Sequence, residues 1–178
     1  DTPIEETLAA HQRLIQQGKV RAVGGSNYDA PGLTDALASG DGKVRARYSV
    51  LQPHYNLLVR DQYEGALENI CISENLGVIP YFALASGFLT GKYRDEAVSY
   101  ASPRAASALK MLNPRGRRIL AALDNVAQQH QATVAQVALA WLLAKGVAAP
   151  IASATTVPQL RELMGSLRIT LDDAQSAQ

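Results

Sequence analysis

The feature that most limits the possible folds of this chain is a regular alternation of helical and extended sequence patterns. Four extended runs are each followed by a helical stretch, and a further helix precedes the first run. This order is typical of a parallel sheet whose faces are covered by helices. The predicted helices are 3–17, 30–39, 61–75, 115–129 and 134–145, with another beginning near Val157 and a last helix start at Thr170, and the predicted strands are 20–24, 48–52, 78–81 and 148–152.

Several predicted helix boundaries carry specific end signals. Gly18 follows the first helical pattern and is expected to stop it. Asp29 is placed to cap the second helix, because an aspartate oxygen accepts hydrogen bonds from the N–H groups of a first helical turn. Thr133 with Gln136 forms a capping-box pattern at the start of the helix over 134–145.

Length and charge narrow the class of protein. The 178 residues are enough for one buried core, so a single domain over 1–178 is predicted. Seventeen basic and sixteen acidic residues give a net charge of +1, and no long run of one sign forms a nucleic-acid-binding surface. No stretch reaches the roughly 18 apolar residues of a membrane span, and no secretory leader pattern opens the sequence. We expect a cytoplasmic protein with neither nucleic acid nor membrane as a partner.

Cys71 is the only cysteine, which excludes an intrachain disulfide and a multi-cysteine zinc site. It falls within the helical pattern over 61–75 and is predicted to be an ordinary buried thiol, with a redox role as the alternative. No metal site is predicted, and the lack of a disulfide framework fits a reducing cytosol.

The segment Gly77 to Tyr93, GVIPYFALASGFLTGKY, runs from an apolar strand into a glycine-containing loop that ends in a lysine and an aromatic residue. Parallel β/α proteins bind their ligands at loops that follow strand ends. The connection continues to about Pro114 without strong periodicity, which is longer than structural loops usually are. We therefore predict that it belongs to a binding site.

Four strand-end motifs together resemble the aldo-keto reductase family, whose members are eight-stranded β/α barrels that use nicotinamide cofactors. The motifs occur in the family's order and cover essentially the whole chain. They are GKVRAVGGSNY at 18–28, LQPHYNLLVR at 51–60, PYFALASGFLTGKYR at 80–94 and PIASATTVPQL at 150–160. The resemblance implies an α/β fold, namely the C-terminal half of a TIM-type (β/α)8 barrel with four β/α units, parallel strands and covering helices.

The resemblance assigns the nicotinamide end of the cofactor to residues at three strand ends. Ser26 and Asn27 match the family's pair that contacts the nicotinamide carboxamide, and Gln52 matches a glutamine that helps hold the same amide. These side chains suit an amide because they offer hydrogen-bond donors and acceptors. Tyr81 matches the aromatic residue that stacks on the nicotinamide ring. The alternatives are turn chemistry for Ser26 and Asn27 and rim packing for Tyr81.

The loop after Tyr81 matches the family's loop around the cofactor pyrophosphate. Glycine in such a loop lets backbone approach the phosphates closely, and lysine supplies a positive charge. The matching residues are Leu84, Ser86, Gly87 and Lys92. Family members commonly read Tyr-Ser-Pro-Leu where this chain reads Tyr-Phe-Ala-Leu at 81–84, so no cofactor contact is implied for residues 82 and 83.

The last motif matches the part of the family that touches the adenosine portion of the cofactor, in a turn and a helix N-terminus after a strand. The matching residues are Ser153, Thr155, Gln159 and Glu162. Arg104, in the long connection, matches another family arginine near the adenine and 2′-phosphate. Many relatives carry arginine or lysine where this chain has threonines at 155 and 156. NADPH is the expected cofactor, with NADH as the alternative.

The family's catalytic aspartate, tyrosine, lysine and histidine lie in the first half of the barrel, and no residue of this chain matches them. His11 and His130 fall in or near helices and are predicted to be solvated or capping. His54 lies at a position that the family does not use catalytically, and Tyr55 belongs to a Tyr-Asn-Leu pattern that is predicted to be architectural. The resemblance implies that the first half of the barrel is absent here, so no catalytic residue is assigned.

Three functional readings stay open. The first is the cofactor-binding half of an NAD(P)H-dependent oxidoreductase that reduces aldehydes or ketones to alcohols, catalytically incomplete by itself and taking a small carbonyl substrate only when the missing half is supplied. The second is a non-catalytic nucleotide-binding or interaction module, a self-associating half-barrel. The third is a remnant with neither binding nor activity. Because half a barrel exposes two strand edges, we expect a homo-oligomer, a missing half or a longer chain to cover them.

Overall fold

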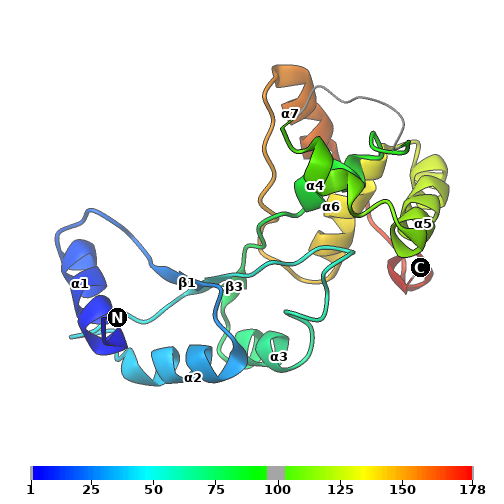
Figure 1. Cartoon of the computed structure of the whole chain (residues 1–178). Helices are drawn as coiled ribbons and strands as arrows, with labels where there is room; N and C mark the ends of the chain where they lie inside the picture. The colour runs from blue at the N-terminus through cyan, green and yellow to red at the C-terminus, as the bar shows by residue number, and fades with distance from the viewer. Residues whose placement is uncertain (1, 96–102, 178) are drawn as a thin grey trace. The chain divides into compact units, whose positions relative to one another are not determined.

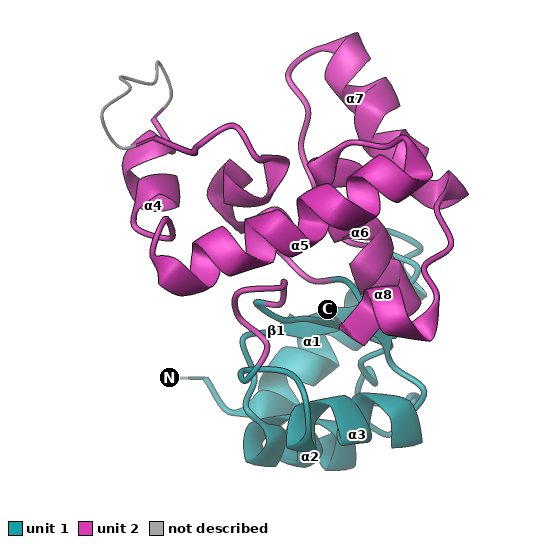
Figure 2. Ribbon diagram, turned by 90° about the vertical axis from the view of Figure 1, so that its right-hand side faces the viewer, with its two compact units in different colours: residues 1–54, 61–79 teal, residues 55–60, 80–178 magenta. Residues whose placement is uncertain are grey.

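The computed structural model describes residues 2–95 and 103–177 (Figure 1). The chain divides into two compact units, which Figure 2 shows in different colours. Unit 1 comprises Asp1–His54 and Asp61–Ile79, and unit 2 comprises Tyr55–Arg60 and Pro80–Gln178. Each unit is described by itself, and the prediction of a single domain over 1–178 stays a prediction.

Unit 1 contains a parallel three-stranded sheet in the order β1-β2-β3. Its strands and helices alternate along the chain, and α2 and α3 lie side by side on one face of the sheet (Figures 1 and 2), as right-handed crossovers require. The elements are α1 (Ile4–Gln16), β1 (Gly24–Ser26), α2 (Ala30–Ser39), β2 (Val50–Gln52), α3 (Ala66–Ser73) and β3 (Gly77–Val78). The predicted alternation is confirmed over this unit, but the strand predicted over 20–24 is wrong in its bounds, because pairing with β2 begins only at Gly24.

The predicted end signals of unit 1 are confirmed. Asp29 accepts the N–H of Gly32 at 2.9 Å and caps α2. Gly18 lies just beyond α1 with a φ of 68°, in the left-handed region where glycine ends a helix without steric cost. The helix predicted over 61–75 begins only at Ala66, because Gly65 has a φ of 96° that no helix can include.

Two of the single-residue predictions for unit 1 have different outcomes. Cys71 is 2% exposed on α3, which confirms a buried thiol. The prediction that His11 is solvated or capping is confirmed only in part, because the side chain is half-buried and its Nδ1 atom is buried without a hydrogen-bond partner among the described residues. Its ring packs 6.4 Å from the ring of Tyr48, which in turn lies 5.8 Å from that of Tyr28. His11 therefore belongs to an aromatic cluster with Tyr48 and Tyr28.

Unit 2 is mainly helical. Two of its helices are capped as the sequence suggests, since Asn113 accepts the N–H of Gly116 at 2.9 Å and the Thr133–Gln136 capping box is present. None of the helices in the described ranges is long and apolar enough to cross a membrane. The elements are η1 (Ala85–Thr90), α4 (Ala105–Leu109), α5 (Pro114–His130), α6 (Val134–Ala144), α7 (Val157–Met164), η2 (Gly165–Arg168) and α8 (Asp173–Ala177).

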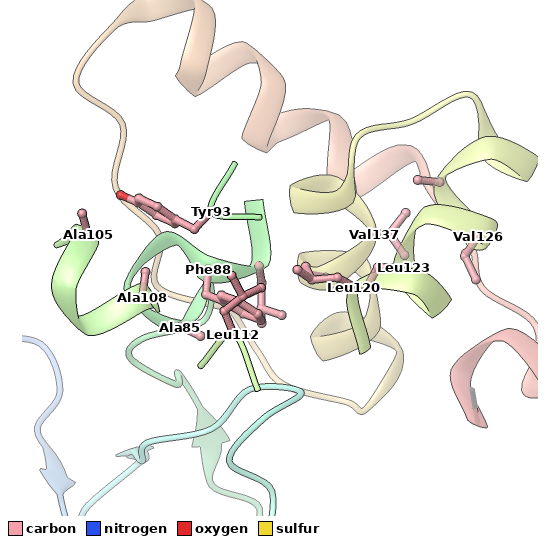
Figure 3. Packing of buried hydrophobic residues seen from close by; sticks show 13 residues of the cluster. Ala85, Phe88, Tyr93, Ala105, Ala108, Leu112, Leu120, Leu123, Val126 and Val137 are labelled. Carbon is pink, nitrogen blue, oxygen red and sulfur yellow. The ribbon is translucent and has the colours of Figure 1, made fainter. Parts of the chain in front are cut away.

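The core of unit 2 joins η1, α4, α5 and α6. Figure 3 shows side chains of this hydrophobic cluster, with Phe88 of η1 and Leu120 of α5 among them. Six consecutive residues of α6, Val137 to Leu142, are buried. A helix that is apolar on all sides is enclosed by its neighbours. The loop that begins at Tyr81 therefore leads directly into a packed core.

The fourth predicted strand, 148–152, is not a strand in the structure. Its backbone makes one bond of the expected kind, from the N–H of Ile151 to the carbonyl oxygen of Pro80 at 2.9 Å. Pro150 has no N–H to donate, so a regular ladder is interrupted there. The four predicted β/α units thus correspond, in the described part of the chain, to three paired strands and one extended segment.

Candidate cofactor-binding site

In unit 1, the residues predicted at the nicotinamide end lie at the carboxyl ends of neighbouring strands. Ser26 ends β1 and is paired in register with Gln52, which ends β2. The hydroxyl of Ser26 donates a hydrogen bond to the carbonyl oxygen of Gln52 at 2.9 Å, tying the two strand ends together. Asn27 follows with a φ of 58°, which asparagine tolerates better than most residues. The structure brings these three residues to one edge of the sheet.

Two glycines make this arrangement possible. A Cβ atom on Gly24 would lie 2.4 Å from Cγ2 of Val50, and one on Gly25 would lie 2.6 Å from the ring of Tyr28. Either side chain would push β1 away from β2 or displace the tyrosine. The glycine pair therefore sets the position from which Ser26 and Asn27 project.

In unit 2, the loop from Tyr81 to Lys92 has an unusual backbone. Phe82, Ala85 and Ser86 have φ values of 54°, 47° and 54°, in the left-handed region although each carries a side chain. A residue with a Cβ atom costs about 1–2 kcal/mol there. Strain of this kind gathers at binding sites and persists only where surrounding contacts hold it.

Asn56 provides one of these contacts. Its side chain is 1% exposed, and its Nδ2 donates to the carbonyl oxygen of Phe82 at 3.0 Å. Its Oδ1 accepts the N–H groups of Leu58 and Val59 at 2.9 and 3.0 Å. The sequence analysis did not single out Asn56. The available signal was a polar residue directly before the apolar residues LLV at 57–59, because an asparagine buried beside them requires hydrogen-bond partners.

The residues predicted around the pyrophosphate form a small cradle. The Lys92 ammonium lies 4.8 Å from the ring centroid of the buried Tyr93. A Cβ atom on Gly87 would lie 3.8 Å from Cε and 4.0 Å from Nζ of Lys92, so glycine keeps open the space beside the positive charge. The carbonyl oxygen of Leu84 accepts a hydrogen bond from the N–H of Gly87 at 2.8 Å. Ser86 lies within the turn that this bond closes and is half-buried. This arrangement fits an anionic group.

Tyr81 stands at the start of the same loop. Its ring is half-buried and meets the ring of Phe82 edge-on, with centroids 5.2 Å apart and an interplanar angle of 63°. Phe82 is 52% exposed. The pair presents apolar aromatic surface, which is what a stacked nicotinamide ring requires.

The residues predicted for the adenosine portion surround the start of α7. Thr155 donates its N–H and its hydroxyl to Oε1 of Gln159 at 2.8 and 2.9 Å. Thr156 caps the helix by accepting the N–H of Gln159 at 3.3 Å. Because Oε1 of Gln159 is used inside the turn, any ligand contact of this side chain has to come from its amide N–H groups. The structure joins Thr155 to Gln159 through these bonds.

The three remaining predicted residues are placed less specifically. Ser153 is exposed ahead of this turn, and Glu162 is half-buried on α7, where its carbonyl oxygen accepts Nε2 of Gln136 at 2.8 Å. Arg104 is exposed at the N-cap of α4. Their roles toward a cofactor stay predictions.

The structure describes the surroundings of the other two histidines. Nε2 of His130 lies 3.1 Å from Oε1 of Gln175, so it pairs with a side chain of α8 rather than with solvent. Burial lowers the pKa of His54. Over residues 2–95 and 103–177, no cluster of three or more His, Cys, Asp or Glu side chains is placed to hold a metal ion.

Comparisons with known proteins identify the family of this chain. The Aldo/keto reductase family matches residues 1–178. The NADH-specific methylglyoxal reductase of Escherichia coli (strain K12) is 32% identical over 182 residues, which cover 98% of this chain and 52% of the relative. The aldo-keto reductase yakc of Schizosaccharomyces pombe, whose name specifies NADP(+), is 29% identical over 179 residues, which cover 98% of this chain and 51% of the relative.

A solved structure gives the same result for the fold. The crystal structure of a thermostable aldo-keto reductase with the inhibitor epalrestat matches with a TM-score of 0.76 and 26% identity, covering 99% of this chain and 53% of that chain. The chain thus spans about half the length of the curated relatives it matches, and its α/β fold with a parallel sheet corresponds to about half of the family barrel. The chain belongs to the Aldo/keto reductase family.

Proposed function

We propose that this chain is the nicotinamide-dinucleotide-binding, C-terminal half of an aldo-keto reductase barrel, and that reduction of an aldehyde or ketone requires the other half. The observation that carries the proposal is the pairing of Ser26 with Gln52 at the ends of adjacent parallel strands. Ligands of parallel β/α proteins bind at that end of the strands.

At the nicotinamide end, the side chains of Ser26, Asn27 and Gln52 hold the carboxamide through its donors and acceptors and thereby fix which face of the ring is presented. The ring of Tyr81 supplies an apolar surface for stacking. When bound, the dinucleotide supplies a hydride. The part played by these residues is orientation.

At the phosphate end, Lys92 neutralises negative charge and Gly87 leaves room for the phosphate oxygens beside it. The hydroxyl of Ser86 and the amide N–H groups of Gln159 add hydrogen-bond donors toward the pyrophosphate and the adenosine portion. Relatives named for NADH and for NADP(+) both match this chain. NADPH is proposed as the cofactor, with NADH as the second ligand in the test.

The test is a titration of the purified chain with NADPH and with NADH, followed by nicotinamide fluorescence. Lys92→Ala and Gln159→Ala are each expected to weaken binding about tenfold or more, since hydrogen bonds to charged groups contribute about 1.5–3 kcal/mol. The matched controls are Lys110→Ala and Gln128→Ala, at exposed positions of unit 2. The proposal fails if millimolar NADPH does not bind, or if the control variants weaken binding as much as the site variants.

A second measurement addresses catalysis. The chain alone is expected to reduce no aldehyde or ketone, because no residue of it matches the family's catalytic set. Turnover by the purified chain, with contaminating reductases removed, would show that this part of the proposal is wrong. Binding without turnover supports a cofactor-binding half.

A second candidate function is a self-associating interaction module, and an exposed apolar stripe in unit 2 favours it. No residue of α7 is buried. Val157, Leu160, Met164 and Leu167 are 60%, 52%, 55% and 62% exposed at helical spacing along α7 and η2. Contiguous apolar surface of this kind usually contacts another protein. We propose a second copy of the chain as that protein.

Solution mass across a range of concentrations tests this candidate. The parent chain is expected to dimerise with increasing concentration, and Leu160→Glu is expected to stay monomeric because it places a charge in the stripe. Ala121→Glu puts the same charge at an exposed position of α5 and is expected to behave like the parent. A parent chain that is monomeric at every concentration contradicts self-association and leaves the cofactor proposal unaffected.

A further inference from the structure

Unit 2 contains a cavity of about 190 Å³ that no predicted cofactor residue lines. Its walls come from the 55–60 segment, α5, α6 and the chain around α8. Most of the lining side chains are apolar, among them Leu57, Leu123 and Val137. A cavity of about 150 Å³ with such walls binds benzene. This one has room for a single ring and a short substituent.

The polar side of the cavity is positive. Arg60 and Arg115 line it, and neither aspartate nor glutamate is among the described lining residues. The guanidinium carbon of Arg60 lies 5.3 Å from the ring centroid of Trp141, which places this cation beside the aromatic wall. A guanidinium next to apolar surface attracts anions more strongly than one in open water, and it pairs with both oxygens of a carboxylate.

Trp141 gives the cavity a fixed aromatic wall. Its Nε1–H donates to the carbonyl oxygen of Ser176 at 3.0 Å, and its ring lies 5.5 Å from that of Tyr55. These contacts set the orientation of the indole. A ligand ring entering the cavity therefore meets a prearranged aromatic surface, which lowers the cost of ordering on binding.

We propose that this cavity is a binding site for a small aromatic carboxylate, separate from the residues assigned to the cofactor. The ring of the ligand packs among Leu123, Val137 and Trp141, and its carboxylate pairs with Arg115, with Arg60 adding positive charge to the same wall. The cavity volume of about 190 Å³ suits a free small molecule and is too small for a folded peptide segment.

Phenylacetate and its neutral analogue phenylacetamide are the probes. Trp141 is the only tryptophan of the chain, so its fluorescence and its indole N–H resonance report on this cavity alone. Phenylacetate is expected to give a saturable change at millimolar concentration. Phenylacetamide is expected to bind about tenfold more weakly, because it lacks the charge that the guanidinium groups recognise.

Two matched pairs of variants locate the ligand. Ala122→Leu fills the cavity from α5 and is expected to abolish the response, whereas Ala121→Leu adds the same group at the exposed neighbouring position and is expected to leave it unchanged. Arg115→Gln is expected to weaken phenylacetate binding about tenfold, and Arg118→Gln, an exposed arginine of α5 that does not line the cavity, is expected to have no effect.

The absence of a saturable response to phenylacetate overturns the proposal. Equal affinity for phenylacetamide shows an apolar cavity without carboxylate recognition and also overturns it. Unchanged binding in Ala122→Leu shows that the ligand lies elsewhere. Far-ultraviolet circular dichroism of each variant establishes that it is folded. Because no cofactor is added, these outcomes do not depend on whether NADPH binds.

Discussion

Replacing Asn56 with alanine tests whether its buried amide holds the strained loop. Three hydrogen bonds are lost, to Leu58, Val59 and Phe82. Val59 keeps a second bond to the carbonyl oxygen of Asn56 at 3.1 Å, and the carbonyl oxygen of Phe82 keeps the N–H of Ala85 at 2.7 Å. The N–H of Leu58 is therefore the most affected group. At about 1 kcal/mol for each bond, Asn56→Ala is expected to destabilise unit 2 by about 3 kcal/mol.

The assay is equilibrium unfolding in urea followed by the fluorescence of Trp141, which lies in the same unit. Asn125→Ala, at an exposed position of α5, is the matched control and is expected to change stability by less than about 0.5 kcal/mol. Hydrogen exchange at the N–H of Leu58 gives a local readout and is expected to accelerate in Asn56→Ala. A loss of stability no larger than the control's, with exchange at Leu58 unchanged, would refute the reasoning.

Three other outcomes are expected. Gly116→Ala destabilises unit 2 by at least about 2 kcal/mol in the same assay, because its Cβ would lie 1.9 Å from the carbonyl oxygen of Met111; parent-like stability contradicts this. Burial raises the pKa of the Cys71 thiol to about 11, so iodoacetamide at about pH 8 should label it only after unfolding, and rapid labelling of folded chain contradicts burial. Backbone hydrogen bonds, above all from Arg45, lower the pKa of Asp41 to about 2. The ionised Asp41 carboxylate therefore stabilises the fold at pH values above the pKa of an unfolded aspartate, and this stabilisation is lost as the pH falls through about 2. A titration of the Asp41 carboxyl carbon by NMR with a midpoint near about 4 contradicts the lowered pKa.

Helix ends could be predicted from the sequence where one side chain or one glycine determines them. Asp29, Thr133 and Gly18 each act within a single turn of their own helix, so the local sequence contains all the required information. The segment 148–152 could form a strand only if another strand paired with it along its whole length. An apolar run does not reveal whether such a neighbour exists, and Pro150 interrupts the ladder in any case.

The candidate site divides in the same way. The sequence motifs predicted that Ser26 and Gln52 belong to the site. The register of β1 and β2 places these two residues opposite each other. The hydrogen bond between them forms only because the two strands pair, which the motifs alone do not reveal. The left-handed backbone at Ala85 and Ser86 opposes the ordinary preference of both residues, so local propensity predicts the wrong conformation. In the sequence, Gly87 was the only sign that the backbone of this loop is left-handed. Contacts distant in sequence, such as that of Asn56 with Phe82, decide this conformation.

The same contacts explain why the loop can keep its shape. Three left-handed residues with side chains cost about 3–6 kcal/mol together. Phe88 and Leu89 follow at once and are 0% exposed, and their burial contributes about 1.5–3 kcal/mol each. With about 3 kcal/mol from Asn56 at the other end, these contacts offset the strain. Because both ends are held by the core of unit 2, the space beside Gly87 and Lys92 exists before any ligand arrives. If the pyrophosphate binds there as proposed, the loop has little order left to gain on binding, so the entropic cost of binding is expected to be small.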